Sequence, residues 1–315
     1  MSIIEHDPWR QQYFENIACP EHIIIPTDDR DSYELYPRLR WVYDKTNLCK
    51  TQNILHASSG VIPLHYPVFS KPITNLRGMG VDGFILYDKT DYHRHCKLGC
   101  FWMEFLTGDH VSTDFALING KVVWQCHTQG YSIGEGLFDY WHISSAPRQA
   151  LENYCRCWLQ DNLGPYTGLV NIETIGGKII EVHLRLIDQW PDLYGRGWLE
   201  AVIGLYDKGE WSLSTSIEKD AYSIVLFGSH DLIYDTPPDT HIQQLKTHPS
   251  VSSIQITFTS QTFGAQAMPP GGFRLAIINC YDLQAGFETR NELRKIFDGM
   301  VLARSERKPN LVNEA

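Results

Sequence analysis

Residues 168–185, GLVNIETIGGKIIEVHLR, contain two short apolar runs separated by a Gly-Gly pair. A pair of glycines between two such runs predicts a β-hairpin. Because side chains alternate between the two faces of a strand, Glu181, His183 and Arg185 share one face. If the glycines turn the chain back, Glu173 on the first strand lies roughly opposite Glu181 on the second.

Two carboxylates that face each other in a hairpin repel unless a cation lies between them. A divalent ion would explain the pair, and oxygen ligands favour Mg²⁺, which in such sites usually accompanies phosphates. The simpler alternative is a solvated hairpin face on which Arg185 neutralises one acid. The pattern alone leaves both interpretations open.

The hairpin resembles the metal-binding hairpin of the ATP-grasp superfamily, in which an acid on one strand is followed by a strand of the pattern Glu-x-Asn-x-Arg. The corresponding residues are Glu173 and EVHLR, so His183 stands in the place of the asparagine. The resemblance implies that Glu173 and Glu181 bind Mg²⁺ and that Arg185 is catalytic. His183 is then either a third metal ligand, which would favour Mn²⁺, or a catalytic residue that faces the γ-phosphate or the substrate.

A second segment, FWMEFLTGDHVSTDFAL at residues 101–117, resembles the adenine hinge of the same superfamily. The resemblance implies that the adenine of ATP is lined by Glu104, Phe105 and Leu106. The part DHVSTD is similar to a segment of biotin carboxylase in which a histidine contacts the ribose. The similarity implies that His110 contacts the ribose of ATP, with Asp109 as the alternative.

Two segments before the hinge each contain a lysine that is a candidate for phosphate binding. FSKPITNLRGMG at residues 69–80 resembles the superfamily's phosphate-binding lysine and glycine-rich loop, which implies phosphate contacts by Lys71 and by the backbone at Gly78 and Gly80. The chemistry fits, since a lysine is a point charge for phosphate oxygens and glycines let backbone N–H groups approach them. Upstream, WVYDKTNL is similar to the Asp-Lys that opens the nucleotide-binding region and makes Lys45 a second candidate.

The C-terminal part resembles the superfamily less closely. MPPGGFRLAIINCYDLQAGFETRNEL, residues 268–293, is faintly similar to the segment that closes biotin carboxylase, in which a strand with an arginine leads to a helix. Arg274 is therefore a candidate catalytic residue, and a purely structural arginine is the alternative.

Strands dominate the middle of the chain and helices flank them, which predicts the α+β class with a mostly antiparallel core. Strand patterns occur at residues 66–72, 83–88, 99–106, 111–118, 121–128, 222–228, 253–258 and 274–282, and helix patterns at 147–158, 195–207 and 288–299. With the resemblance, this gives an ATP-grasp fold with mostly antiparallel sheets and flanking helices. We expect a shortened pre-grasp region at residues 1–55, a small subdomain at 56–130, a large subdomain with a C-terminal extension at 131–300 and a tail at 301–315.

Composition excludes several classes of protein. The chain has 315 residues, 43% of them hydrophobic, and a formal net charge of −10. It has no basic surplus for nucleic acid and no apolar run long enough to span a membrane, so we expect neither as a partner. The N-terminus lacks the pattern of a secretory signal, which predicts a cytoplasmic protein.

Eight cysteines at irregular positions fit reduced thiols better than a disulfide framework. The cluster HRHCKLGC at residues 93–100 could suggest zinc. It has no second Cys/His pair at a recognised spacing, so buried thiols beside surface histidines are the preferred interpretation.

The resemblance implies an ATP- and Mg²⁺-dependent ligase that activates a carboxylate as an acylphosphate and joins it to an amine. The acid and the amine would be small molecules or peptides. A phosphotransferase on the same fold and a nucleotide-binding module without catalysis remain alternatives. Because the opening region is short, we expect a second subunit, a partner protein or the residues after 200 to complete the substrate pocket.

Overall fold

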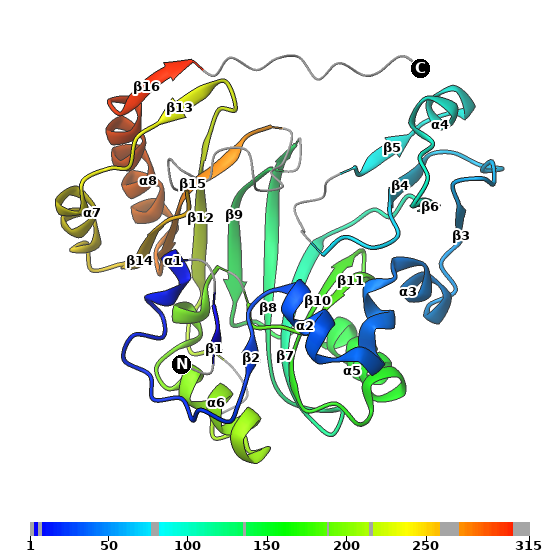
Figure 1. Cartoon of the computed structure of the whole chain (residues 1–315), viewed down its shortest axis with the longest axis horizontal. Coiled ribbons are helices and arrows are strands. Elements are labelled where there is room, and N and C mark those ends of the chain that lie inside the picture. The colour runs from blue at the N-terminus through cyan, green and yellow to red at the C-terminus, as the bar shows by residue number, and fades with distance from the viewer. Residues whose placement is uncertain are drawn as a thin grey trace.

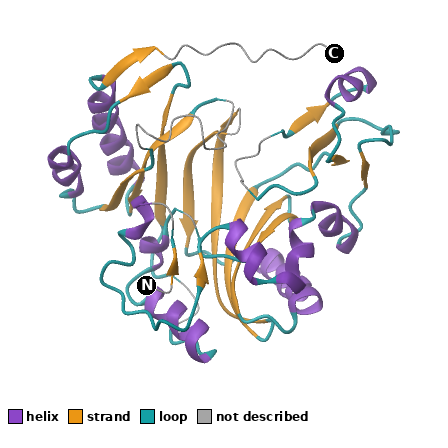
Figure 2. Cartoon of the chain, in the orientation of Figure 1, coloured by secondary structure: helices purple, strands orange, loops and turns teal. Residues whose placement is uncertain are grey.

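The computed structural model describes residues 3–5, 8–76, 82–134, 137–187, 189–213, 217–258 and 271–304. One large sheet lies at the centre, and a smaller sheet lies above one of its ends (Figure 1). Helices pack around both sheets (Figure 2). The α+β class with mostly antiparallel sheets is thereby confirmed.

The large sheet has eight strands in the order β11-β10-β7-β8-β9-β12-β15-β14, and every neighbouring pair is antiparallel. Its strands are β7 (His110–Ile118), β8 (Lys121–Gly134), β9 (Leu137–Ser144), β10 (Gly168–Ile175), β11 (Lys178–His183), β12 (Ala221–Gly228), β14 (Val251–Ile256) and β15 (Phe273–Cys280). Alternation in β7 places buried Phe115 and Leu117 on one face and His110, Ser112 and Asp114 on the other. The second face is the one that carries polar residues next to the hairpin.

Helices cover the apolar face of this sheet. The helix α5 (Gln149–Leu163) packs Cys155, Trp158 and Leu159 against the side of β7 and β10. The helices α7 (Asp239–Lys246) and α8 (Leu283–Asp298) cover β12, β14 and β15 in the same way. The apolar residues whose spacing predicted α5 and α8 therefore lie on the buried face of each helix.

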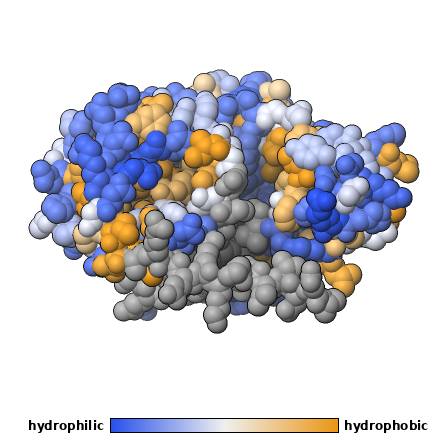
Figure 3. Space-filling model, turned by 90° about the horizontal axis from the view of Figure 1, so that it is seen from above, coloured by the Kyte–Doolittle hydropathy of each residue, from blue (hydrophilic) through white to orange (hydrophobic). Residues whose placement is uncertain are grey.

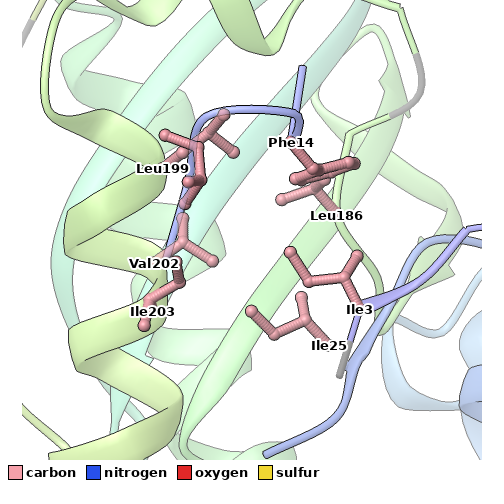
Figure 4. A pocket seen from close by; sticks show the side chains of 8 residues that line it. Ile3, Phe14, Ile25, Leu186, Leu199, Val202 and Ile203 are labelled. Carbon is pink, nitrogen blue, oxygen red and sulfur yellow. The ribbon is translucent and has the colours of Figure 1, made fainter. Parts of the chain in front are cut away.

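The opposite face is partly covered by short elements. These are β1 (Ile3–Ile4), β2 (Ile25–Pro26), the 3-10 helix η2 (Pro191–Tyr194) and α6 (Trp198–Lys208). In Figure 4, Ile3 and Ile25 face Val202 and Ile203 of α6 across an apolar contact. The helix α6 begins at Trp198 and not at residue 195, because Gly195 and Gly197 adopt positive φ angles that do not continue a helix.

The small sheet has four antiparallel strands in the order β3-β6-β4-β5. They are β3 (His56–Ser58), β4 (Val68–Pro72), β5 (Phe84–Leu86) and β6 (Cys100–Glu104), with α4 (Lys89–His95) beside them. The chain reaches this sheet through α1 (Pro8–Gln11), α2 (Asp29–Leu35), the 3-10 helix η1 (Pro37–Tyr43) and α3 (Lys45–Thr51). Seen from above, the surface of this lobe mixes polar and apolar residues (Figure 3).

The strands divide the chain differently from the expected boundaries. Residue 130 lies inside β8, and the small sheet ends at Glu104, so the change from the small to the large sheet falls near residues 105–109. The strand patterns at residues 111–118 and 121–128 could not show to which sheet these strands belong. Residues 301–304 form β16 (Val301–Arg304), which pairs with β13 (Leu232–Tyr234), whereas the rest of the expected tail lies outside the described residues.

All eight cysteines are free thiols. Cys96 is exposed and Cys100 is buried. Within the described ranges, no three or more His, Cys, Asp or Glu side chains are grouped as a metal centre, and this includes the segment considered for zinc. None of the described helices is long and apolar enough to cross a membrane.

Candidate active site

The β10–β11 hairpin has the predicted register. Glu173 is the direct partner of Glu181, and Asn171 is the partner of His183. At the turn, Gly176 has φ 55° and lies so close to the hinge that a Cβ atom would be 2.2 Å from the carbonyl oxygen of Thr107. Only glycine fits there, because both the backbone angle and the close approach exclude a side chain.

His183 lies between three acids. Its Nδ1 is 2.9 Å and 3.0 Å from the two carboxylate oxygens of Asp29. Its Nε2 is 3.6 Å from Glu181 and 3.8 Å from Glu173. Burial alone would lower the pKa of His183, but the charge of Asp29 raises it to about 9. The imidazole therefore supplies positive charge next to the paired acids.

Two further basic side chains of the protein approach the paired acids. Lys45 Nζ is 3.4 Å from Glu181 Oε1, and His110 Nε2 is 3.1 Å from Glu173 Oε2. Burial would raise the pKa of Glu173, but the hydrogen bond with His110 and the nearby imidazole of His183 hold it well below its usual range. The cations that the opposed carboxylates require thus come partly from the chain itself.

Lys71 connects the small sheet to the hairpin. It lies in β4, is buried, and its Nζ donates to the backbone oxygen of Ile180 in β11 at 3.1 Å. Burial lowers the pKa of Lys71, and the carboxylate of Glu181 opposes that shift. Lys45 and Lys71 therefore meet beside one acid although they belong to different elements.

Arg185 lies next to the same group. Its Nε donates to Asp29 Oδ1 at 3.1 Å, so Asp29 holds both Arg185 and His183. Asp29 is buried, and although burial would raise its pKa, Arg185 and His183 lower it. The buried hydroxyl of Tyr43 accepts from the backbone N–H of Leu184 and fixes the strand between the two cations.

The predicted hinge runs between the two sheets. The N–H of Glu104 donates to Leu55, Phe105 is 38% exposed, and Leu106 packs against buried residues of the small sheet. The backbone oxygen of Asp109 accepts from Gly176, which ties the hinge to the turn of the hairpin. The Asp109 carboxylate pairs with Arg148 at 3.2 Å.

Solved structures with a similar fold are known, although no protein-family model and no curated sequence matches the chain. An L-amino acid ligase from Bacillus licheniformis superposes with a TM-score of 0.63 at 12% identity, over 94% of this chain and 84% of that chain. An N5-carboxyaminoimidazole synthetase from Staphylococcus aureus, complexed with ADP, has a TM-score of 0.56 at 12% identity, over 93% of this chain and 84% of that chain. A phosphoribosylglycinamide synthetase from Anaerococcus prevotii has a TM-score of 0.54 at 11% identity, over 93% of this chain and 85% of that chain. The chain has the ATP-grasp fold.

The ATP-grasp fold brings most of the predicted residues to one place. Lys45 and Lys71 contact the hairpin through the side chain of Glu181 and the backbone oxygen of Ile180. The hinge passes beside the hairpin and hydrogen-bonds to its turn. His110, expected at the ribose, contacts Glu173 and the rings of Phe138 and Trp141. Gly78 and Gly80 lie outside the described residues.

Arg274 is not brought to the hairpin. It lies in β15, and five strand spacings separate β15 from β10 in the sheet. Its backbone oxygen accepts from the hydroxyl of Thr257. At about 4.8 Å per strand, this places Arg274 on the order of 24 Å along the sheet from Glu173.

The donor set fits a metal ion that arrives with a nucleotide. Glu173 and Glu181 face each other, and the buried Nε2 of His183 between them has no hydrogen-bond partner among the described residues. These three side chains do not form a closed metal centre by themselves. Mg²⁺ is commonly held by one or two carboxylates together with substrate phosphates, so the two acids fit that mode of binding.

Sequence reasoning missed Asp29. Asp28 caps α2 by accepting from the N–H of Asp31, and Asp29 is the first residue of that helix. The only local signal for Asp29 is a second acid after the cap. Its partners lie 154 and 156 residues further along the chain, which no local pattern reveals.

Proposed function

We propose that this chain is an ATP-dependent ligase that activates a carboxylate as an acylphosphate and joins it to an amine. The observation that carries the proposal is the pairing of Glu173 with Glu181, with Lys45 and Lys71 beside them. The ligases with the same fold support an enzyme of this general kind. Their low sequence identity leaves the acid and the amine open.

Each group of residues has a separate role in the proposed reaction. Glu173 and Glu181 would hold Mg²⁺, which when bound offsets charge on the β- and γ-phosphates. Lys45 and Lys71 would bind phosphate oxygens as point charges, and burial strengthens these contacts because water does not screen them. Arg185 would offset the charge that builds during transfer.

The hinge would orient the adenine without charge. Backbone groups of residues 104–106 and the side chains of Phe105 and Leu106 suit a flat heterocycle. The hinge hydrogen-bonds to the hairpin turn through Asp109 and Gly176, so the adenine and phosphate ends of the nucleotide would be positioned by one connected segment. Such positioning is the main contribution a protein makes to phosphoryl transfer.

In the first step, an oxygen of the substrate carboxylate attacks the γ-phosphorus, and ADP leaves. In the second, the amine nitrogen attacks the acyl carbon of the acylphosphate, phosphate leaves, and the nitrogen loses a proton to give an amide. His183 and Arg185, on the same strand face and joined through Asp29, would bind the anionic groups formed in both steps.

A nucleotide-binding module without catalysis is the second candidate. Glu173 and Glu181 already contact basic side chains of the chain, which are Lys45, His110 and His183. These contacts favour the module, because they reduce the need for a metal ion between the two acids. Such a module would bind ATP and release no ADP.

The experiment that separates these candidates measures ADP release with Mg-ATP in a matrix of carboxylic acids and amines. A ligase requires both an acid and an amine for ADP release and forms an amide detectable by mass spectrometry. ADP release with the acid or another acceptor alone, and a stable phosphorylated product, would indicate a phosphotransferase. Absence of ADP release across amino acids, peptides and polyamines, with retained ATP binding, would favour the module.

We also propose that a second copy of this chain completes the substrate pocket. Light scattering over micromolar concentrations tests this directly. A dimer whose dissociation lowers specific activity supports it, and a monomer with concentration-independent specific activity contradicts it.

A further inference from the structure

A buried group of polar residues lies on the same face of the large sheet as the paired acids, but at its other end. Register pairs place Glu173, Ser112, Thr128, Ile143 and Ala221 in one row across five strands. The row ends at Ala221 in β12, and Ser223 lies two residues further along that strand. The partner of Ser223 in β15 is Asn279. At about 4.8 Å per strand, Ser223 is on the order of 19 Å along the sheet from Glu173, so this group is a separate site.

The donors of this group converge on two oxygens. Asn279 Nδ2 donates to Asp192 Oδ1 at 2.7 Å and to the backbone oxygen of Gln189 at 2.8 Å. Gln255 Nε2 donates to the same backbone oxygen at 3.3 Å, as does the Tyr13 hydroxyl. These contacts show that Gln189, Asp192, Gln255 and Asn279 form one cluster.

The remaining oxygens of the cluster have no donor among the described residues. Asn279 is 0% exposed and Gln255 is 1% exposed. The buried side-chain oxygens without a hydrogen-bond partner are Gln189 Oε1, Asp192 Oδ2, Ser223 Oγ, Gln255 Oε1 and Asn279 Oδ1. We refer to these five atoms as the oxygen cluster. Each buried acceptor left unpaired costs roughly 1–3 kcal/mol, so a group that satisfies several of them would stabilise the fold.

Rotating the amides does not remove the excess of acceptors. If Asn279 were turned by 180°, its oxygen would face Asp192 Oδ1 and the Gln189 carbonyl, both of which are acceptors. Turning Gln255 would place its oxygen against the same carbonyl, although the Ser253 hydroxyl beside it could then donate. The hydrogen-bond network therefore assigns the orientation of Asn279, whose side-chain oxygen has no hydrogen-bond partner among the described residues.

We propose that the oxygen cluster binds one compact monovalent cation, either an inorganic ion or a primary ammonium group. Amide, hydroxyl and carboxylate oxygens can together replace the hydration shell of such an ion, as carbonyl oxygens do for K⁺. The cluster offers a single carboxylate, Asp192, whose one negative charge matches one positive charge. A divalent ion such as Ca²⁺ generally takes more carboxylates.

The environment of Asp192 agrees with this assignment. Burial raises its pKa, although Ser252, Ser253 and Asn279 lower it by hydrogen bonding. Asp192 is half-buried, and its buried Oδ2 is the oxygen whose charge a cation would compensate. The proposal does not depend on the nucleotide site, since none of these residues contacts the hairpin acids in the described part of the chain.

The test is thermal unfolding of the full chain without nucleotide, at one ionic strength, with choline chloride as the reference salt. Choline is a bulky quaternary ammonium ion with no N–H to donate, whereas K⁺, Na⁺, NH₄⁺ and methylammonium are compact. A bound cation should raise the melting temperature by about 2 °C or more over choline at 100 mM. A shift with K⁺ or Na⁺ identifies an inorganic ion, and a shift with NH₄⁺ and methylammonium alone identifies an ammonium group.

Two variants assign the effect to the cluster. Asp192→Asn removes the charge at nearly constant shape and should abolish the cation-specific shift, and Ser223→Ala should weaken it. Asp231→Asn, an exposed acid after β12, is the matched control and should keep the full shift. Equal melting temperatures in all salts for the native chain, or an unchanged shift in both Asp192→Asn and Ser223→Ala, would overturn the proposal.

Discussion

Asp29, the first residue of α2, holds His183 of the hairpin at 2.9 Å, although 154 residues separate them in the chain. The same carboxylate accepts from Arg185. The short opening region therefore contributes directly to the site, because it orients the two cations next to the paired acids. Both side chains of the Asp29–His183 pair are more than 90% buried, so the contact is little screened by water.

Replacing Asp29 tests this connection. Asp29→Asn leaves His183 and Arg185 without their shared anion, and removal of one partner from a buried ion pair costs about 3–5 kcal/mol. Urea unfolding should show this loss of stability. The control is Asp28→Asn at the neighbouring N-cap, which should cost little because asparagine caps helices about as well as aspartate. Equal stability of Asp29→Asn and the native chain would show that the pair is not energetically important.

The charge of His183 predicts a pH dependence of stability in the nucleotide-free protein. Its pKa is raised from 6.5 to about 9 in the fold, where it faces Asp29, Glu173, Glu181 and Arg185. The stabilisation is therefore complete below pH 6.5 and is lost as the pH rises through 9. Melting temperatures from pH 6 to 10 should fall for the native chain and fall less for His183→Asn. His22→Asn, at an exposed histidine, should follow the native curve.

His183→Asn also restores the residue found in the metal-binding hairpin of the ATP-grasp superfamily. If His183 binds phosphate or substrate and not the metal, the preference between Mg²⁺ and Mn²⁺ should not change. Improved activity with Mg²⁺ together with a lost preference for Mn²⁺ would instead identify His183 as a metal ligand.

The two turn glycines form a matched pair for mutation. Alanine at either position meets a positive φ and should cost about 1–2 kcal/mol. A Cβ at Gly176 would also meet the Thr107 oxygen at 2.2 Å, whereas nothing lies within 4 Å of one at Gly177. Gly176→Ala should therefore be clearly less stable than Gly177→Ala by urea unfolding and should bind nucleotide more weakly, because the hinge is displaced. Equal effects of the two changes would argue against a tight contact between hinge and hairpin.

Removing one charge at a time separates binding from chemistry. Glu173→Gln and Glu181→Gln keep the shape of the hairpin, so turnover with an identified substrate pair should fall at least about 100-fold with a smaller loss of ATP affinity. Glu200→Gln, at an exposed acid of α6, is the control. Near-native turnover in both hairpin variants would exclude these acids as the metal site.

The hairpin could be predicted because its information is local. The Gly-Gly pair and the alternation of residues 168–185 determine that Glu173 meets Glu181, and the structure has this register. The contacts of Asp29 and Lys71 could not be predicted, because they depend on how α2 and the small sheet pack on β11. Similarly, the turn at residues 119–120 was predictable, but the membership of β7 and β8 in the large sheet is a property of long-range strand order.

Nucleotide binding at the hairpin is tested most directly by the melting curve of the native chain with and without millimolar Mg-ATP. Because a ligand that binds only the folded state stabilises it, the melting temperature should rise by several degrees. Lys71→Ala, which removes the buried cation beside Glu181, should lose most of this shift, whereas Lys50→Ala at an exposed position of α3 should retain it. An unchanged melting curve for the native chain in saturating Mg-ATP would contradict the assignment of the site.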